Sequence, residues 1–208
     1  MKTLVDFSSW ERRDTFSFFR DFYNAYINVT CPVDCSIAKR NAKEAGVSFF
    51  LYYLHAIAKG LNEIEELRYR IDPEGNVVIY DVINILTPIK NKTKGGYTTV
   101  LLPYTPDREA FIENSARIIN SIAEDNPFGA ETACPEYDVV VVSAIPNLPF
   151  TSLNCTQKHM GGSDYPLINV GMMGTDFKMP IAISVHHGFV DGEQIADFYH
   201  VIQKSLNA

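Results

Sequence analysis

Apolar residues recur every three or four positions in four segments of the chain, and this spacing predicts amphipathic helices. The segments are 14–26, 47–64, 107–124 and a final helix that starts at Asp191. The first presents an aromatic face, and the second has so many apolar residues that we expect it to be buried. Ser48 can cap the second helix, and Pro106-Asp107 can start the third as a surface helix.

Runs rich in β-branched and aromatic residues predict strands between these helices. Residues 68–71 and 77–80 flank a Pro-Glu-Gly-Asn turn, so they are expected to form a hairpin. Further strands are predicted at 81–87, 97–102, 138–144, 168–173 and 181–185, with a polar loop at 90–96 and with the last two strands adjacent in the sheet. Strands that mostly do not alternate, mixed with helices, predict an α/β (α+β) two-layer sandwich in which helices pack on a large mixed β-sheet.

Length and charge narrow the class of protein. A chain of 208 residues, 46% of them apolar, can bury one core but is short for two, so we expect a single domain over 1–208. The net charge of -7 and the lack of a long basic run make nucleic acid an unexpected partner. Asp6 interrupts any signal peptide, and no apolar run approaches the roughly 18 residues of a membrane span. We therefore expect a cytoplasmic protein without a membrane partner.

The four cysteines do not predict a metal site. Cys31, Cys35, Cys134 and Cys155 lack the two-residue-spaced pairs that zinc sites favour. Cys31 and Cys35 are close in the chain, but in a reducing cytosol they are expected to be free thiols or small core residues rather than a disulfide.

The richest chemistry lies in the segment 184–192, where two histidines follow an apolar strand and precede a tight turn and a helix. A histidine at a strand end can accept a proton at neutral pH and return it later. Other interpretations stay open on spacing alone: His186 and His187 can be structural residues or two metal ligands, and Asp191 with Gln194 has the pattern of a helix capping box.

The sequence His186-His187-Gly188-Phe189-Val190-Asp191-Gly192 resembles the HHxxxDG motif of the chloramphenicol acetyltransferase family, which related CoA-dependent acyltransferases share in looser form. The resemblance extends over nearly the whole chain, because six further segments match in the same order. They are 7–13, 49–70, 77–81, 142–144 with Pro146, 150–152 and 179–180.

The resemblance implies transfer of an acetyl group from acetyl-CoA, a co-substrate rather than a permanently bound cofactor, to an acceptor hydroxyl. His187 matches the family's general base and His186 its supporting neighbour. Ser143 matches the serine that donates to the oxyanion of a tetrahedral intermediate, and Asp191 matches an aspartate that pairs with an arginine, here Arg12. Direct transfer through that intermediate is expected, without an acyl-enzyme or a metal.

The acceptor is expected to be chloramphenicol, and it is here that the chain departs from the family pattern. Asn169 stands where a threonine is usual, Phe19 where a pocket tyrosine is common and Tyr97 where a pocket phenylalanine is common, and Asn147 replaces a tryptophan. The alternatives are an acyltransferase with another small-molecule acceptor and a relative that binds without turnover. The family further implies a homotrimer, with His187 of one chain facing Phe19, Tyr97, Ser143 and Asn169 of the next, and with Phe19, Tyr97, Asn169 and His186 around the substrate.

Overall fold

A mixed six-stranded sheet forms the centre of the computed structural model, which describes residues 1–91, 95–122, 137–155 and 164–208. Its strand order is β2-β9-β8-β7-β5-β6. β7 runs parallel to β5 and to β8, and the other neighbouring pairs are antiparallel. The strands are β2 (Tyr26–Asp34), β5 (Asn84–Lys90), β6 (Tyr97–Leu102), β7 (Val139–Ala144), β8 (Leu167–Val170) and β9 (Lys178–His186).

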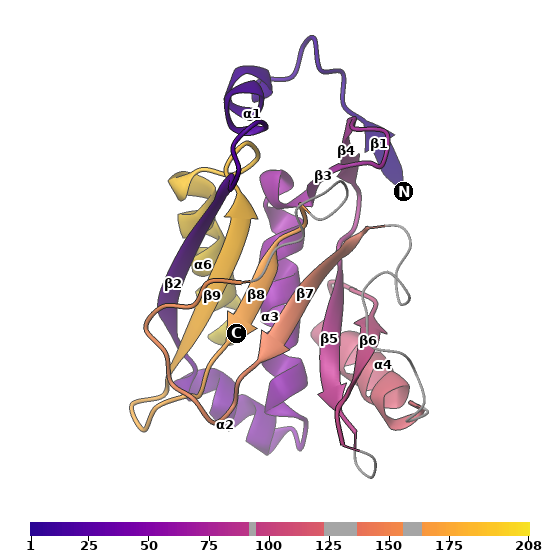
Figure 1. The fold of residues 1–208 in the computed structure, drawn as a ribbon. Helices are drawn as coiled ribbons and strands as arrows, with labels where there is room; N and C mark the ends of the chain where they lie inside the picture. Colours follow the sequence, from indigo (N-terminus) through magenta and orange to yellow (C-terminus); the bar gives the residue numbers. More distant parts are fainter. Residues whose placement is uncertain (92–94, 123–136, 156–163) are drawn as a thin grey trace.

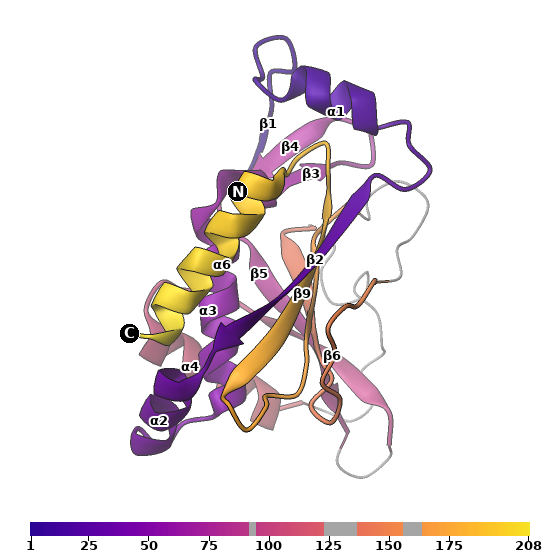
Figure 2. The same ribbon diagram turned by 90° about the vertical axis from the view of Figure 1, so that its left-hand side faces the viewer.

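In the part of the chain that the structure describes, a layer of helices covers one face of this sheet, as Figure 2 shows in side view. They are α2 (Ser36–Glu44), α3 (Phe49–Glu63), α4 (Arg108–Asn120) and α6 (Gly192–Leu206). One layer of helices on one mixed sheet confirms the predicted two-layer α/β arrangement. Among the described residues, no helix combines the length and the apolar character that crossing a membrane requires.

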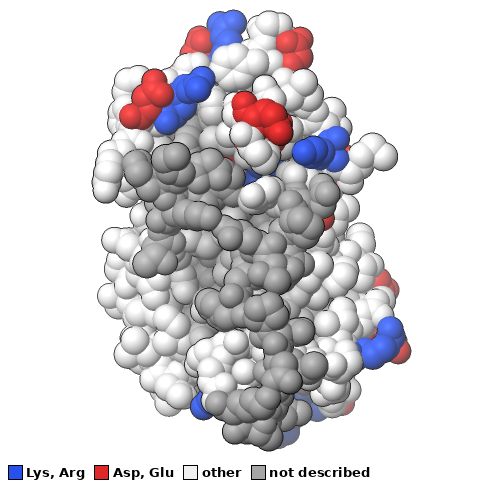
Figure 3. Space-filling view, turned by 45° about the vertical axis from the view of Figure 1, so that its right-hand side comes forward, with Lys and Arg blue, Asp and Glu red and all other residues white. Residues whose placement is uncertain are grey.

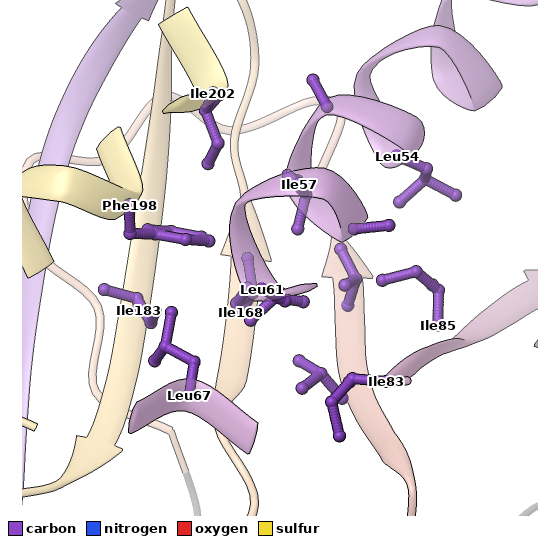
Figure 4. Packing of buried hydrophobic residues seen from close by; sticks show 14 of the residues in the cluster. Leu54, Ile57, Leu61, Leu67, Ile83, Ile85, Ile168, Ile183, Phe198 and Ile202 are labelled. Carbon is purple, nitrogen blue, oxygen red and sulfur yellow. The ribbon is translucent and has the colours of Figure 1, made fainter. Parts of the chain in front are cut away.

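The core lies between α3 and the sheet (Figure 4). Leu54, Ile57 and Leu61 of α3 are fully buried, as the sequence predicted for this helix. On the other side α3 packs against α6 at Gly60, where an added Cβ would lie 2.9 Å from Phe198 Cδ2. Because Gly60 has no side chain, the Phe198 ring packs directly against the backbone of α3, and this close contact holds α6 against α3.

A second, three-stranded sheet lies at the end of the molecule where β9 finishes (Figure 1). It consists of β1 (Lys2–Leu4), β4 (Val77–Tyr80) and β3 (Tyr69–Ile71), the last preceded by the 3-10 turn η1 (Glu65–Arg68). β3 and β4 are antiparallel, which confirms the predicted hairpin. Helix α1 (Arg13–Phe19) lies beside this sheet and above the end of β9.

The predicted helix over 14–26 is too long. α1 ends at Phe19, and Tyr26 is already the first residue of β2, which pairs with β9 along its whole length. Asn24 helps this change of direction, because its side chain accepts the backbone N–H of Tyr26. Sheet pairing outweighs the helical spacing of the aromatic residues here. Neither β2 nor α2 was predicted from the sequence.

Other boundaries shift by a few residues. The strand predicted at 81–87 is displaced to Asn84–Lys90, since Asn62 of α3 accepts the N–H of Ile83 and delays the start of pairing. The helix predicted at 107–124 is confirmed as far as Asn120, and Asp107 caps it by accepting the N–H of Ala110 at 2.8 Å. Residues 123–124, Cys134 and positions 92–94 of the predicted loop lie outside the described residues. β8 and β9 are neighbours, as predicted.

Candidate active site

The two histidines lie where β9 ends and the chain turns into α6. His186 is the last residue of β9, and its carbonyl accepts the N–H groups of Phe189 and Val190 at 3.0 and 3.2 Å. The N–H of His187 donates to the carbonyl of Ala25 at 2.7 Å, which ties the turn to the segment before β2. The turn therefore holds His187 and Asp191 in one place at the end of the sheet.

The ring of His187 has a defined tautomer. Its Nδ1 lies 3.0 Å from the carbonyl oxygen of Val190 and 3.4 Å from Asp191 Oδ1. Neither oxygen can donate, so these contacts assign the proton to Nδ1 and leave the lone pair on Nε2. The side chain is 31% exposed, and the ring of Phe19 stacks on it with centroids 4.3 Å apart. Nε2 is therefore the nitrogen that can accept a proton from a substrate.

Phe19 reaches His187 from the same chain, whereas the family resemblance implied that it comes from a neighbouring one. The reason is the short length of α1, which is anchored over the turn by Phe16. The Phe16 ring stacks on Phe189 with centroids 5.1 Å apart. Phe19 follows one turn later on the same helix and so covers His187.

An ion pair holds both ends of the turn. Arg12 Nη1 donates to Asp191 Oδ2 at 2.9 Å, and Arg12 Nε donates to the carbonyl of Gly188 at 3.3 Å. The hydrogen bond from Arg12 lowers the pKa of Asp191, so this residue stays a carboxylate. The backbone N–H of Asp191 donates to Gln194 Oε1 at 2.9 Å within a capping box. Asp191 thus starts α6 and pairs with Arg12 at the same time.

His186 points away from solvent. It is only 7% exposed and lies among the rings of Phe16, Tyr26 and Phe189. Its Nδ1 accepts the N–H of Gly188 at 3.0 Å. Burial, with a smaller contribution from His187, lowers the pKa of His186 to about 4. This burial argues that His186 positions the turn and does not contact a substrate.

We expect the neutral state of His186 to make stability depend on pH. An unfolded histidine takes a proton near pH 6.5, whereas folded His186 takes one only near pH 4. This pKa difference corresponds to on the order of 3 kcal/mol in the free energy of unfolding, which is fully present above pH 6.5 and is lost as the pH falls from 6.5 to 4. Urea unfolding at several pH values measures this loss.

The matched variant for that experiment is His186→Gln. Asp164, whose pKa burial raises to about 6, contributes in the opposite direction, but it is present in both proteins and cancels in the comparison. We expect the variant to lose less free energy of unfolding than the parent protein between pH 6.5 and 4. Equal slopes in the two proteins would exclude His186 as the cause.

Gly188 is required by close packing, and Gly188→Ala tests this. An added Cβ would lie 2.9 Å from His186 Nδ1 and 3.0 Å from Phe16 Cδ2, both in packed rings. We expect a loss of about 1–3 kcal/mol in the free energy of unfolding, measured in urea. Gly192→Ala is the control, because its added Cβ meets nothing within 4 Å, and it should change stability by no more than about 0.5 kcal/mol. Equal stability of the two variants would contradict this explanation.

Ser143 and Asn169 lie elsewhere, side by side on β7 and β8, where they are register partners. Together with Cys155 they line a pocket of about 300 Å³, and Asn169 Nδ2 contacts Cys155 Sγ at 2.7 Å. Asn169 pairs with Ala182, five residues before His187 on β9, which is a separation of about 16 Å along the strand. One chain therefore does not bring Ser143 to His187.

Tyr97 is also distant from His187 within the chain. It begins β6, four strands from β9, which is about 19 Å across the sheet, and it is 54% exposed. The described residues contain no group of three or more His, Cys, Asp or Glu side chains that could hold a metal ion. Cys31, Cys35 and Cys155 are free thiols, and burial raises the pKa of Cys35 to about 12.

Comparison with known proteins decides the family. The chloramphenicol acetyltransferase family model matches residues 1–203. The chain belongs to the chloramphenicol acetyltransferase family. A solved structure called chloramphenicol acetyltransferase is 43% identical, with a TM-score of 0.93 over 99% of this chain and 100% of that one. Chloramphenicol acetyltransferase 3 of Escherichia coli is 22% identical over 99% of this chain and 97% of its own.

The fold of this family extends to other acyltransferases. A probable dihydrolipoamide acetyltransferase from Listeria monocytogenes has a TM-score of 0.59 over 93% of this chain and 88% of its own, at 14% identity, which shows a shared fold alone. This likeness agrees with the CoA-dependent acyltransferase type of sandwich that the motif implied.

Three features of the site could not be found from the motif alone. The carbonyl of Val190, which assigns the His187 tautomer, belongs to the backbone and has no sequence signal. Phe16 and Tyr26 were counted only as members of an aromatic helix face, although both enclose His186. Cys155 was noted as a cysteine, but nothing in its surroundings in the sequence placed it beside Asn169.

Proposed function

We propose that this chain transfers the acetyl group of acetyl-CoA to a hydroxyl of chloramphenicol, with His187 as the general base. The family membership and the names of its relatives support the reaction and the acceptor. The observation that carries the proposal is the contact between His187 Nδ1 and the carbonyl of Val190, because it leaves Nε2 free to take a proton.

In the proposed reaction, His187 acts first. Nε2 of His187 takes the proton of the acceptor hydroxyl, and the oxygen attacks the thioester carbonyl of acetyl-CoA. The tetrahedral oxyanion that forms accepts a hydrogen bond from Ser143 Oγ. When the intermediate collapses, the C–S bond breaks and the leaving thiolate takes the proton from His187. The products are the acetyl ester and free coenzyme A, and no acyl-enzyme is needed.

Arg12, Asp191 and His186 serve this reaction indirectly in the proposal. Arg12 and Asp191 hold the turn, and Asp191 Oδ1 also lies 3.4 Å from His187 Nδ1. This contact helps to fix the orientation of the imidazole ring. His186 fills the space beneath the turn. Phe19 on the His187 side, with Asn169 and Tyr97 on the Ser143 side, would contact the acceptor.

We further propose a homotrimer in which two chains share each active site. The distance of about 16 Å along β9 that separates His187 from the level of Ser143 supports this, since both groups must meet one thioester. In the view of Figure 3, the described charged side chains lie mostly at the upper end of the molecule, with a few at its right-hand and lower edges.

The proposal also places the protein in the cytoplasm. The free thiols of Cys31, Cys35 and Cys155 agree with this location, because disulfides are rare in that compartment.

The acceptor is tested by following free coenzyme A with a thiol reagent after acetyl-CoA and chloramphenicol are mixed with the protein. We expect release that depends on both substrates, and mass spectrometry should find acetylated chloramphenicol. Release with other small hydroxyl compounds but not with chloramphenicol would favour the alternative of a different acceptor. Binding of acetyl-CoA without any release would favour a relative that binds without turnover.

A further inference from the structure

A second hollow is lined by residues of β1, the segment after it, α1 and its C-terminal end, and the turn that joins β3 to β4. Figure 2 shows where these elements lie in the fold. Its volume is about 540 Å³, which is within the range of small-molecule sites in proteins. It shares no lining residue with the pocket beside Ser143, and neither His187 nor Asp191 lines it.

The lining of this hollow combines apolar and polar residues, with Arg20 as its cation and Asp6 as its anion. Leu4 and Phe7 supply most of the accessible apolar surface, at 64% and 37% exposed, whereas Phe16 and Val77 lie almost fully buried behind them. Burial of such surface by a ligand would be favourable.

Arg20 supplies the charge. Its guanidinium lies 3.7 Å from the carboxylate of Asp21, and both side chains are more than half exposed. This ion pair is therefore weak. Asp6, which also lines the hollow, stays an anion, but its carboxylate accepts hydrogen bonds from Ser8 and Ser9 and forms no ion pair with Arg20 among the described residues. An arginine that is not committed to a strong partner can bind a carboxylate with two parallel hydrogen bonds.

Helix α1 connects this hollow to the catalytic turn. Phe16 lines the hollow and also packs on His186, with ring centroids 5.9 Å apart. Arg20, which also lines the hollow, directly follows Phe19 in the chain, and the Phe19 ring stacks on His187. At the other end of the helix, Arg12 pairs with Asp191. A ligand that changes the position of this seven-residue helix therefore changes the surroundings of the His187 ring.

We propose that this hollow binds a small amphipathic carboxylate, with its apolar body against Leu4 and Phe7 and its carboxylate on Arg20, and that binding is transmitted through α1 to His187. The binding half is independent of the acetyl-transfer reaction. The effect of binding on His187 concerns the residue on which the proposed function rests. Binding and its effect on His187 are therefore both measured without acetyl transfer.

Isothermal titration calorimetry with 2-naphthoate tests the binding. We expect saturable binding, weakened at least about tenfold by Arg20→Gln, because a hydrogen-bonded charge pair is lost. Arg13→Gln on the same helix is the matched control and should bind like the parent, since Arg13 pairs with Asp14 and does not line the hollow. The neutral analogue 2-naphthalenemethanol should bind at least about tenfold more weakly than the carboxylate.

Three results would overturn the binding site: no saturable binding, equal binding to the Arg20→Gln variant, or competition by chloramphenicol, which would place the naphthoate in the acyl-transfer pocket.

The effect of binding on His187 is measured by NMR of the His187 imidazole, whose signal is assigned by its loss in His187→Ala. We expect this signal to shift on saturation with 2-naphthoate in the parent but not in Arg20→Gln at the same concentration. An unchanged His187 signal in the saturated parent would refute the coupling, and this outcome does not depend on whether the protein acetylates chloramphenicol.

Discussion

Replacing His187 with alanine is expected to lower kcat for acetyl transfer by about 10²–10⁴-fold. The variant loses the Nε2 lone pair, which the contact of Nδ1 with the Val190 carbonyl leaves available in the parent. The turn itself should persist, because the backbone N–H of His187 still donates to Ala25 and Arg12 still pairs with Asp191. The measurement is the steady-state release of free coenzyme A.

His200→Ala is the matched control for this experiment. His200 lies on α6 and its side chain is 81% exposed, so its loss should leave kcat unchanged. Thermal unfolding of both variants shows whether they fold like the parent. If folded His187→Ala protein releases coenzyme A within a few-fold of the parent rate, His187 is not the base and the proposed function is wrong.

Replacing Ser143 with alanine should lower kcat by about 10²–10³-fold, with little change in the binding of acetyl-CoA. The reason is the loss of a hydrogen bond to charge that exists only in the tetrahedral intermediate. Ser143 is a half-buried strand residue beside Asn169, so the smaller side chain leaves the pairing of β7 with β8 intact. Steady-state kinetics separates kcat from KM, and a rise in KM alone would contradict the assignment.

The same variant tests whether the site is shared between chains. Each variant alone is expected to keep about one hundredth of the parent activity or less, but in the proposed trimer a mixed assembly would bring intact His187 of one chain to intact Ser143 of the next. With random mixing of equal amounts, three quarters of the trimers are mixed and each has one complete site, so about one quarter of the parent activity should return. The control mixes His187→Ala with the double variant, which restores no site. Mixing that restores nothing in assembled hybrids would show that each site belongs to one chain.

Much of the site was accessible from sequence because its parts are local. The residues from His186 to Gly192 are contiguous, and a strand end followed by a capped helix places two of them, His187 and Asp191, together without information from the rest of the chain. The spacing of Asp191 and Gln194 predicted the capping of α6, whereas the pairing of Asp191 with Arg12 was implied by the family resemblance alone.

Local periodicity was less successful where long-range pairing decides the structure. The aromatic stripe from Phe16 to Tyr26 has helical spacing, yet only its first part is helix. The remainder forms the start of β2, because nine register pairs with β9 stabilise an extended chain more than one further helical turn would. A sequence window cannot see β9, which lies about 150 residues later.

The sequence by itself determined the two-layer class, the buried helix α3, the β3–β4 hairpin and the capped start of α6 at Asp191, since each depends on composition or spacing within a short segment. Only the tertiary structure decided that Phe19 covers His187 in the same chain, that His186 is buried, and that Ser143 lies on another part of the sheet. These facts depend on strand order and register, which are set by contacts between residues far apart in the chain.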